Sequence, residues 1–160
     1  MKAKAKKSWR EKLADDKDLP KVCETAGKLT KRWGQGKFVV PAPREVDVLM
    51  KQVPRGRLVT INELRLALAR KHKTDFACPI TTGIFSWIAA YAAAEDEADG
   101  KKRVTPFWRT LKTGGEINPK YPGGPAGIAR RLRAEGHKIT PKGKRLFVSD
   151  YQKALFAELG

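Results

Sequence analysis

Few side chains in this 160-residue sequence could perform nucleophilic or metal chemistry. The two cysteines, Cys23 and Cys78, lie in dissimilar contexts and form no CxxC pair, so the sequence predicts neither a metal site nor a cofactor. Cys78 directly precedes a helical pattern, and a helix N-terminus favours the thiolate form of a cysteine. His72 is the only histidine near Cys78 in the sequence, and it belongs to a different helical pattern.

The stretch from Val104 to Gly136 (VTPFWRTLKTGGEINPKYPGGPAGIARRLRAEG) is organised around two glycine pairs. A β-branched and aromatic run from Val104 to Leu111 leads into the first pair, and an arginine-rich apolar pattern follows the second. The run predicts a strand, and the pattern from Ala126 to Glu135 predicts a helix. Together they predict a pocket wall closed by loops, with a helix behind it.

This stretch resembles the C-terminal core of the methylated-DNA-protein-cysteine methyltransferases. The family motif is Pro-Cys-His-Arg, followed by a Tyr-x-Gly-Gly turn and a helix that ends in Glu-Gly. The matching residues are Pro106 and Arg109 in the first motif, Tyr121, Gly123 and Gly124 in the turn, and Glu135 and Gly136 at the helix end. Phe107 and Trp108 occupy the positions of the family cysteine and histidine.

These two replacements remove the chemistry that the resemblance would otherwise imply. Alkyl transfer from a guanine oxygen needs a thiolate, a base that forms it and a carboxylate that orients the base. By the resemblance Glu135 is that carboxylate, and we expect it to have nothing to orient. The related alkyltransferase-like proteins also lack the cysteine, usually with Trp in its place, and bind alkylated guanine without repairing it. We therefore expect no enzymatic activity.

The formal net charge is +17, and the excess of basic residues lies towards the two ends of the sequence. Residues 1–36 carry a net charge of +6, residues 37–100 of +1 and residues 101–160 of +10. This distribution predicts a polyanionic partner, which we expect to be double-stranded DNA. The basic first ten residues lack the apolar core of a leader, and no run approaches the ~20 apolar residues of a membrane span. We expect no membrane partner and a location in the cytoplasm, on the nucleoid.

Three helical patterns follow one another between Pro43 and Asp99. Thr60 and Glu63 form a capping-box pair at the start of the second, whose expected buried face contains Leu64, Leu66, Ala67, Leu68 and Ala69. An expected extended hairpin rich in Gly and Lys follows the third, in the order of a winged helix-turn-helix. The expected fold class is α/β, mostly α. A winged-helix core would cover residues 41–136, with extensions at residues 1–40 and 137–160.

The third helical pattern is the expected recognition helix. Its hydroxyl groups could donate to phosphates or base edges, or they could serve only to cap the helix; they belong to Thr81, Thr82 and Ser86. Basic residues after the helix are the expected DNA contacts, although the family keeps the arginine of its motif mainly for structural support. These residues are Lys101, Lys102, Arg103, Arg109, Lys112 and Lys120.

The resemblance also implies a pocket for an alkylated base. We expect its walls at Pro106, Phe107, Trp108 and Tyr121, whose rings could stack on a base. The alternative is that the rings only fill the volume of an abandoned active site. Ile61 replaces the family Tyr that rotates a phosphate, and Thr82 falls at the position of the Arg that enters the base stack. Base extrusion costs a few kcal/mol, which some other contact has to offset.

The two extensions have patterns of their own. In the first, we expect a basic arm with a short helix, then a helix from Lys21 to Arg32 and a strand from Phe38 to Val40. In the second, we expect a hairpin formed by Ile139 and residues 144–148. A final helix, capped by Ser149 or Asp150, would bury Tyr151, Leu155, Phe156 and Leu159.

The leading interpretation is a non-catalytic, alkyltransferase-like protein of DNA repair that binds duplex DNA, senses alkylated guanine and recruits a DNA-repair protein. A first alternative is a DNA-binding regulatory module with a vestigial pocket, in which the acidic residues Glu95, Asp96, Glu97 and Asp99 face a basic partner. A second alternative is an active alkyl acceptor that uses Cys78 as a relocated nucleophile.

Overall fold

The computed structural model describes residues 7–160, and the first six residues of the expected basic arm lie outside this range. The fold is α/β and mostly helical. The N-terminal extension contains helix α1 (Trp9–Ala14), strand β1 (Lys21–Glu24), helix α2 (Lys28–Trp33) and strand β2 (Lys37–Val40). Helix α3 (Pro43–Lys51) follows directly.

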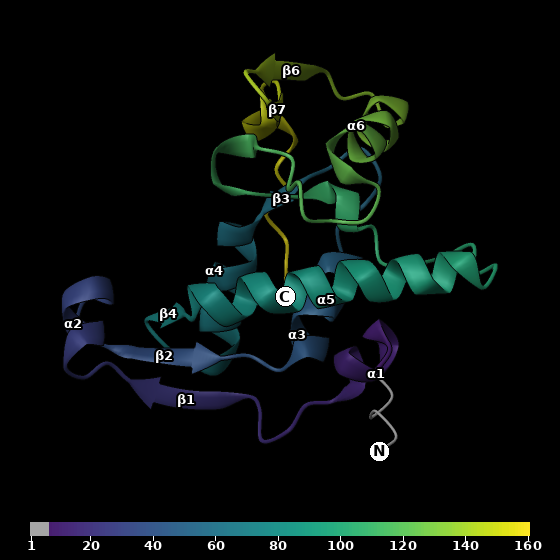
Figure 1. The fold of residues 1–160 in the computed structure, drawn as a ribbon. Coiled ribbons are helices and arrows are strands. Elements are labelled where there is room, and N and C mark those ends of the chain that lie inside the picture. The colour runs from purple at the N-terminus through teal and green to yellow at the C-terminus, as the bar shows by residue number, and fades with distance from the viewer. Residues whose placement is uncertain (1–6) are drawn as a thin grey trace.

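The helix-turn-helix consists of α4 (Ile61–His72) and the twenty-residue α5 (Pro79–Ala98). Strand β3 (Val59–Thr60) leads into α4, where Thr60 and Glu63 form the expected capping box. The short strand β4 (Phe76–Ala77) connects the two helices. Figure 1 shows α5 crossing the molecule, with α1 and α3 below it and α6, β6 and β7 above it.

The chain after α5 is built from turns and short strands. Two 3-10 turns, Phe107–Arg109 and Thr113–Gly115, flank strand β5 (Thr110–Leu111), which pairs in parallel with β3. Helix α6 (Gly124–Ala134) follows the second glycine pair. Strands β6 (Ile139–Lys142) and β7 (Arg145–Val148) form the expected antiparallel hairpin. The segment directly after α5, where a hairpin was expected, is therefore a loop around a single short strand.

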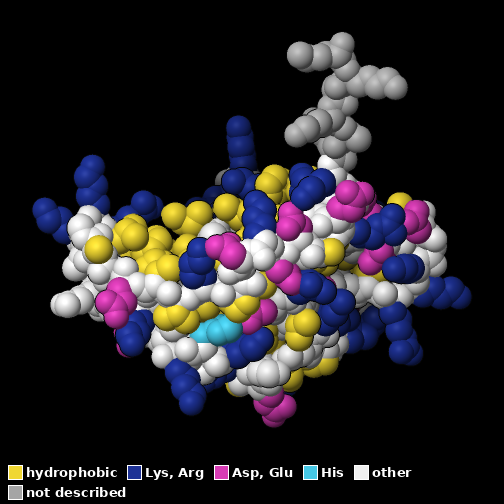
Figure 2. All heavy atoms as spheres, turned by 90° about the horizontal axis from the view of Figure 1, so that it is seen from below, with side chains coloured by type: hydrophobic (Ala, Val, Ile, Leu, Met, Phe, Trp, Pro, Cys, Tyr) yellow, Lys and Arg dark blue, Asp and Glu magenta, His cyan; other side chains and the backbone are white. Residues whose placement is uncertain are grey.

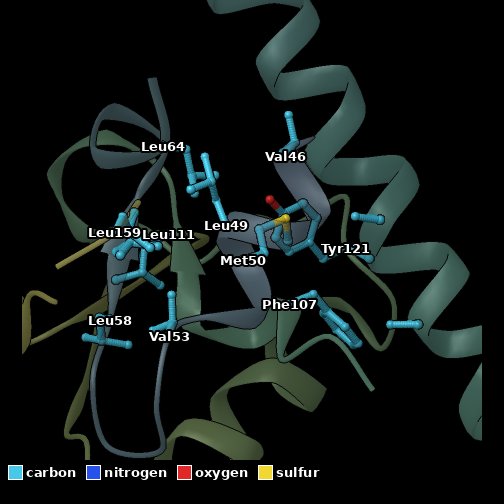
Figure 3. Close-up of a cluster of buried hydrophobic side chains, with 14 of the residues drawn as sticks. Val46, Leu49, Met50, Val53, Leu58, Leu64, Phe107, Leu111, Tyr121 and Leu159 are labelled. Atoms are coloured by element: carbon cyan, nitrogen blue, oxygen red, sulfur yellow. The ribbon is translucent and has the colours of Figure 1, made fainter. Parts of the chain in front are cut away.

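One hydrophobic core joins the helix-turn-helix to the C-terminal extension. Buried side chains of α3, α4 and α6 pack with Phe107 and Tyr121, and Leu159 belongs to the same cluster. Figure 3 shows Leu159 with Leu58 and Leu111 in this core. The backbone of Leu58 exchanges hydrogen bonds with the C-terminal segment, at 2.9 Å to Ala154 and 2.8 Å to Phe156.

The N-terminal extension is also packed against the helix-turn-helix. Strand β2 pairs in parallel with β4, so that Phe38 stacks on Phe76 with ring centroids 5.4 Å apart. In α1, the Trp9 ring lies 5.4 Å from that of Trp87 and 4.9 Å from that of Tyr91 on α5. The structure thus places both extensions in contact with the helices that they flank.

Three further expectations about local structure are wrong. The helix expected over residues 21–32 is strand β1 followed by the shorter α2, because β1 pairs with β2 along its whole length. The final helix is a single 3-10 turn, Tyr151–Ala154, because the residues after it run extended beside Leu58. Leu66 is 59% exposed, while the other four residues of its expected buried face are buried.

Candidate nucleic-acid interface

A groove runs along the N-terminal half of α5. Its helix wall consists of Ile80, Gly83, Ile84 and Trp87, at the spacing of one helix face. The opposite wall is the loop after β5, with Lys112, Asn118, Pro119 and Lys120. The groove has a volume of about 530 Å³. The Trp87 indole N–H donates to the Lys120 carbonyl oxygen at 3.0 Å, which ties the two walls together.

A second hollow, of about 350 Å³, adjoins this groove. The two share Gly83, Lys112 and Asn118. On its inner side the Tyr121 hydroxyl donates to Ser86 Oγ at 2.9 Å, and the Ser86 hydroxyl donates to the Gly83 carbonyl at 2.7 Å. Burial raises the pKa of Tyr121 to about 12, so the phenol is neutral at physiological pH.

The second hollow has a basic rim. Arg145, from β7, bonds to the buried Glu116 carboxylate at 2.6 Å, and Lys112 lies 3.7 Å from the same oxygen. The bond from Arg145 holds the pKa of the Glu116 carboxyl below its ordinary value, despite the burial that opposes this shift. Glu116 is therefore ionised at neutral pH. With Arg145 and Lys112 beside it, this cluster has a net charge of +1.

Glu135 is fully occupied, so the expectation that it has nothing to orient is wrong. Its carboxylate accepts the Trp108 indole N–H at 2.7 Å, the Arg109 guanidinium at 2.9 Å and the Gly56 amide at 3.1 Å. Burial raises the pKa of the Glu135 carboxyl, but the three donors lower it by more than burial raises it. The pKa of Glu135 therefore lies below its ordinary value. The carboxylate therefore joins α6, the Phe107–Arg109 turn and the turn before β3.

The residues expected to form a lesion pocket do not line one common hollow. Phe107 is 1% exposed and packs edge-on against Tyr121, with ring centroids 6.2 Å apart. The Arg131 guanidinium lies 4.4 Å from the Trp108 ring and 5.3 Å from the Phe107 ring. Of the four expected residues only Tyr121 lines the second hollow, while Pro106 is buried.

The hydroxyl groups expected to contact DNA point into the protein. Thr82 is fully buried, and its hydroxyl donates to the Cys78 carbonyl at 2.6 Å. Ser86 is held between Tyr121 and Gly83, at the floor of the second hollow. Within residues 7–160 the buried Thr81 hydroxyl oxygen has no hydrogen-bond partner.

The basic residues expected to contact DNA separate into two groups. Lys112 and Lys120 line the groove, and Lys102 and Arg103 are exposed after α5, without ion pairs to the described residues. Lys101 pairs with Asp96 at 3.3 Å, and Arg109 is engaged by Glu135. Figure 2, which views the molecule from below Figure 1, shows Lys and Arg side chains projecting around the edge of that face, with Asp and Glu side chains among them and hydrophobic side chains gathered on one part of it.

The acidic end of α5 is engaged within the chain. Arg10 of α1 lies 2.6 Å from Asp99 and 3.4 Å from Asp96, and its amide donates to Glu95 at 2.9 Å. Arg131 of α6 pairs with Glu97 at 2.7 Å. These contacts fix α1 and α6 on the helix-turn-helix.

The sequence reasoning missed several residues that line the two hollows. They are Ile80, Gly83, Ile84, Trp87, Asn118 and Arg145. The spacing of residues 80, 83, 84 and 87 on one helix face was visible in the sequence. The position of Arg145 was not, because it depends on where the β6–β7 hairpin packs.

Neither hollow contains a reactive thiol. Cys78 is 5% exposed before α5, Cys23 lies in β1, and neither lines the groove or the second hollow. Among residues 7–160 no group of His, Cys, Asp and Glu is arranged to hold a metal ion. No helix in this part of the chain is long and apolar enough to cross a membrane.

No protein-family model matches the sequence, and no curated protein matches it either. Two solved structures are similar. An ATL protein of S. pombe in complex with DNA is 17% identical, with a TM-score of 0.51. S. pombe Atl1, in complex with damaged DNA containing O6-carboxymethylguanine, is 16% identical, with a TM-score of 0.49. Each likeness covers 71% of this chain and 93% of the other. The similarity to the ATL protein, with its TM-score of 0.51, shows a shared fold.

Proposed function

We propose that this protein binds double-stranded DNA along the groove beside α5, without transferring an alkyl group. The observation that carries the proposal is the position of the groove, on the second helix of a helix-turn-helix and opposite Lys112 and Lys120. Lys102 and Arg103 extend the basic surface beyond α5. The net charge of +17 and the shared fold with a protein bound to DNA support the same partner.

The second hollow is the proposed site for an extruded, alkylated guanine. It opens from the groove at Gly83 and combines apolar walls, from Ile61 and Leu111, with polar groups that could meet the edge of a base. Asn118, Thr113 and Arg145 provide those polar groups. In this proposal Tyr121 contributes to the base site, while Phe107 and Trp108 support it from behind.

The groups around the hollow support the proposal that no alkyl group is transferred. No lining residue is a cysteine. The Ser86 hydroxyl is bonded to Tyr121 and to a backbone carbonyl, and the carboxylate that lines the same hollow, Glu116, is paired with Arg145. At the positions of the family motif the Phe107 and Trp108 rings have no ionisable group.

Competition between a duplex that contains O6-methylguanine and a plain duplex tests lesion recognition. We expect the wild-type protein to prefer the alkylated duplex, and Arg145→Ala to reduce this preference. Arg130→Ala, which changes an exposed arginine of α6, is the matched control and should retain the preference. Equal affinity of the wild-type protein for both duplexes would remove the sensing role and favour a DNA-binding regulatory module with a vestigial pocket.

A further inference from the structure

Several exposed cations in the N-terminal half of the chain form no ion pair with the described residues. They lie on helix α2, at the start of β2 and directly after α4, and we call them the α2 cluster: Lys28, Lys31, Arg32, Lys37 and Lys73. Residues 24–37 and 73–76, which contain the cluster, include two carboxylates, those of Glu24 and Asp75. This part of the surface therefore has a net charge of +3.

The neighbouring cations of the N-terminal extension are engaged within the chain instead. Each of them has a carboxylate partner, and the pairs are Lys7–Asp15, Arg10–Asp99, Lys21–Asp18 and Arg44–Asp16. The Arg10 pair, at 2.6 Å, holds α1 on α5, and the Arg44 pair joins α3 to the segment after α1. The charge of the α2 cluster, which no such pair uses, remains available to an external anion.

Aromatic packing fixes the α2 cluster to the helix-turn-helix. The Trp33 ring, at the end of α2, meets the Phe38 and Phe76 rings edge-on, with ring centroids 5.5 Å and 5.9 Å apart. The Lys37 amide donates to the Asp75 carboxylate at 2.9 Å, and the Asp75 amide donates to the Lys37 carbonyl oxygen at 2.9 Å. The backbone that carries the cluster is therefore held in place before a partner binds, which lowers the entropy cost of binding.

The α2 cluster lies outside the groove and the second hollow, beyond the start of α5. Phe76 belongs to β4, and α5 begins three residues later at Pro79, next to the groove-lining Ile80. Figure 1 shows α2 on this side of the molecule, past the start of α5 and beside β2. A duplex that fills the groove and continues past the start of α5 would meet α2 next.

We propose that the α2 cluster binds phosphates of the duplex that flanks the groove, as a second contact surface on the same DNA molecule. A duplex presents one phosphate charge per ~1.7 Å of its axis, so a row of exposed cations can contact it in any sequence. This inference rests on the proposed DNA binding and adds a surface that the N-terminal extension provides. The added contacts lengthen the bound stretch of DNA and steepen the salt dependence of binding.

The test compares K28A/K31A/R32A with the wild-type protein on two plain duplexes, one of about 10 base pairs, a single helical turn, and one of about 25 base pairs. Alanine favours a helix and Trp33 is unchanged, so α2 should remain folded, which circular dichroism and urea unfolding would verify. The control is R130A/R133A/K138A, which removes three exposed cations in and directly after α6. Both variants lose the same charge, so a difference between them reports where the charge was lost.

On the longer duplex, K28A/K31A/R32A should weaken binding about tenfold at low salt and reduce the slope of log Kobs against log salt by about 3 in magnitude, since each phosphate contact contributes about 0.9. The control variant should keep the wild-type slope. On the shorter duplex, where the groove cations act alone, the wild-type slope should be smaller than on the longer one. Equal slopes for the two triple variants on the longer duplex would overturn the flanking contact and leave DNA binding in the groove standing. If the wild-type protein bound neither duplex, the proposed function would fall as well.

Discussion

The indole N–H of Trp108 points at the carboxylate of Glu135 across 2.7 Å, and the Arg109 guanidinium holds the same carboxylate at 2.9 Å. By the resemblance, Glu135 would orient a catalytic histidine at position 108. Here tryptophan supplies an N–H donor at that position and has no lone pair with which to accept a proton. The hydrogen-bonded network therefore joins the end of α6 to the Phe107–Arg109 turn and to Gly56.

The Glu135 network should contribute to stability in a pH-dependent way. Glu135→Gln should lower the free energy of unfolding by about 3 kcal/mol near neutral pH, because it leaves Arg109 without its counter-ion. The pKa of Glu135 is lower in the folded chain than its ordinary value of 4.5. Its contribution is therefore complete above that value and is lost as the pH falls through the folded-state pKa. Urea unfolding at several pH values measures the difference.

The matched control for this prediction is Glu158→Gln, at an exposed glutamate, which should change stability by less than about 0.5 kcal/mol. The gap between the wild-type protein and Glu135→Gln should narrow in acid. A gap that is absent at neutral pH, or that widens as the pH falls, would contradict the assigned role of Glu135.

Cys78 should accept no alkyl group. Its thiol is buried before α5 and lies outside both hollows, so an alkylated base bound there would not reach it. Intact-protein mass spectrometry after incubation with an O6-methylguanine duplex should show the unmodified mass. The same protein, unfolded and treated with iodoacetamide, should be labelled at both cysteines. An alkyl adduct on Cys78 in the native protein would restore the alternative of a relocated nucleophile.

The N-terminal helix should unfold together with the rest of the chain. Trp9→Ala removes the ring that packs on Trp87 and Tyr91, and should lower the free energy of unfolding by about 2 kcal/mol. Glu11→Ala, at an exposed residue of the same helix, should have an effect below about 0.5 kcal/mol. Equal urea midpoints for Trp9→Ala and the wild-type protein would show that α1 does not belong to the cooperative unit.

Two substitutions at Gly83 should have separate effects, one on stability and one on DNA binding. Gly83→Ala should raise stability by about 0.5 to 1 kcal/mol, because Gly83 lies within a helix and has space for a Cβ. Gly83→Leu should also fold, but its side chain would project into the groove between Ile80 and Ile84 and weaken DNA binding several-fold. Thermal unfolding and fluorescence anisotropy measure the two effects. Wild-type affinity in Gly83→Leu would place the DNA elsewhere on the molecule.

The parts of the fold that depend on local chemistry were predictable. The capping box of Thr60 and Glu63 located the start of α4, and the hairpin at residues 139–148 was visible as two short extended runs. Strand β1 was not, since its four residues are extended only because they pair with β2. The extended C-terminal segment depends in the same way on pairing with Leu58, about one hundred residues earlier in the chain.

The candidate site shows a similar division. The sequence directed attention to α5 and to Lys112 and Lys120, since helix order and charge can be read from residue types. It gave no means of knowing that Thr82 faces inward while Ile84 faces outward. Which face of a helix is buried depends on where its neighbours pack, and α1, α3 and the Trp87 bond to the loop decide this for α5.

Salt-dependent binding to duplex DNA tests the central claim most directly. Fluorescence anisotropy with a plain and an O6-methylguanine duplex, over a series of salt concentrations, gives the slope of log Kobs against log salt. If Lys102, Arg103, Lys112 and Lys120 each neutralise one phosphate, the slope should be about −3 to −4. Lys120→Ala should reduce its magnitude by about 1, while Lys71→Ala, at a lysine paired with Glu45 between α3 and α4, should leave it unchanged. Failure to bind either duplex, or binding that does not weaken with salt, would contradict the account.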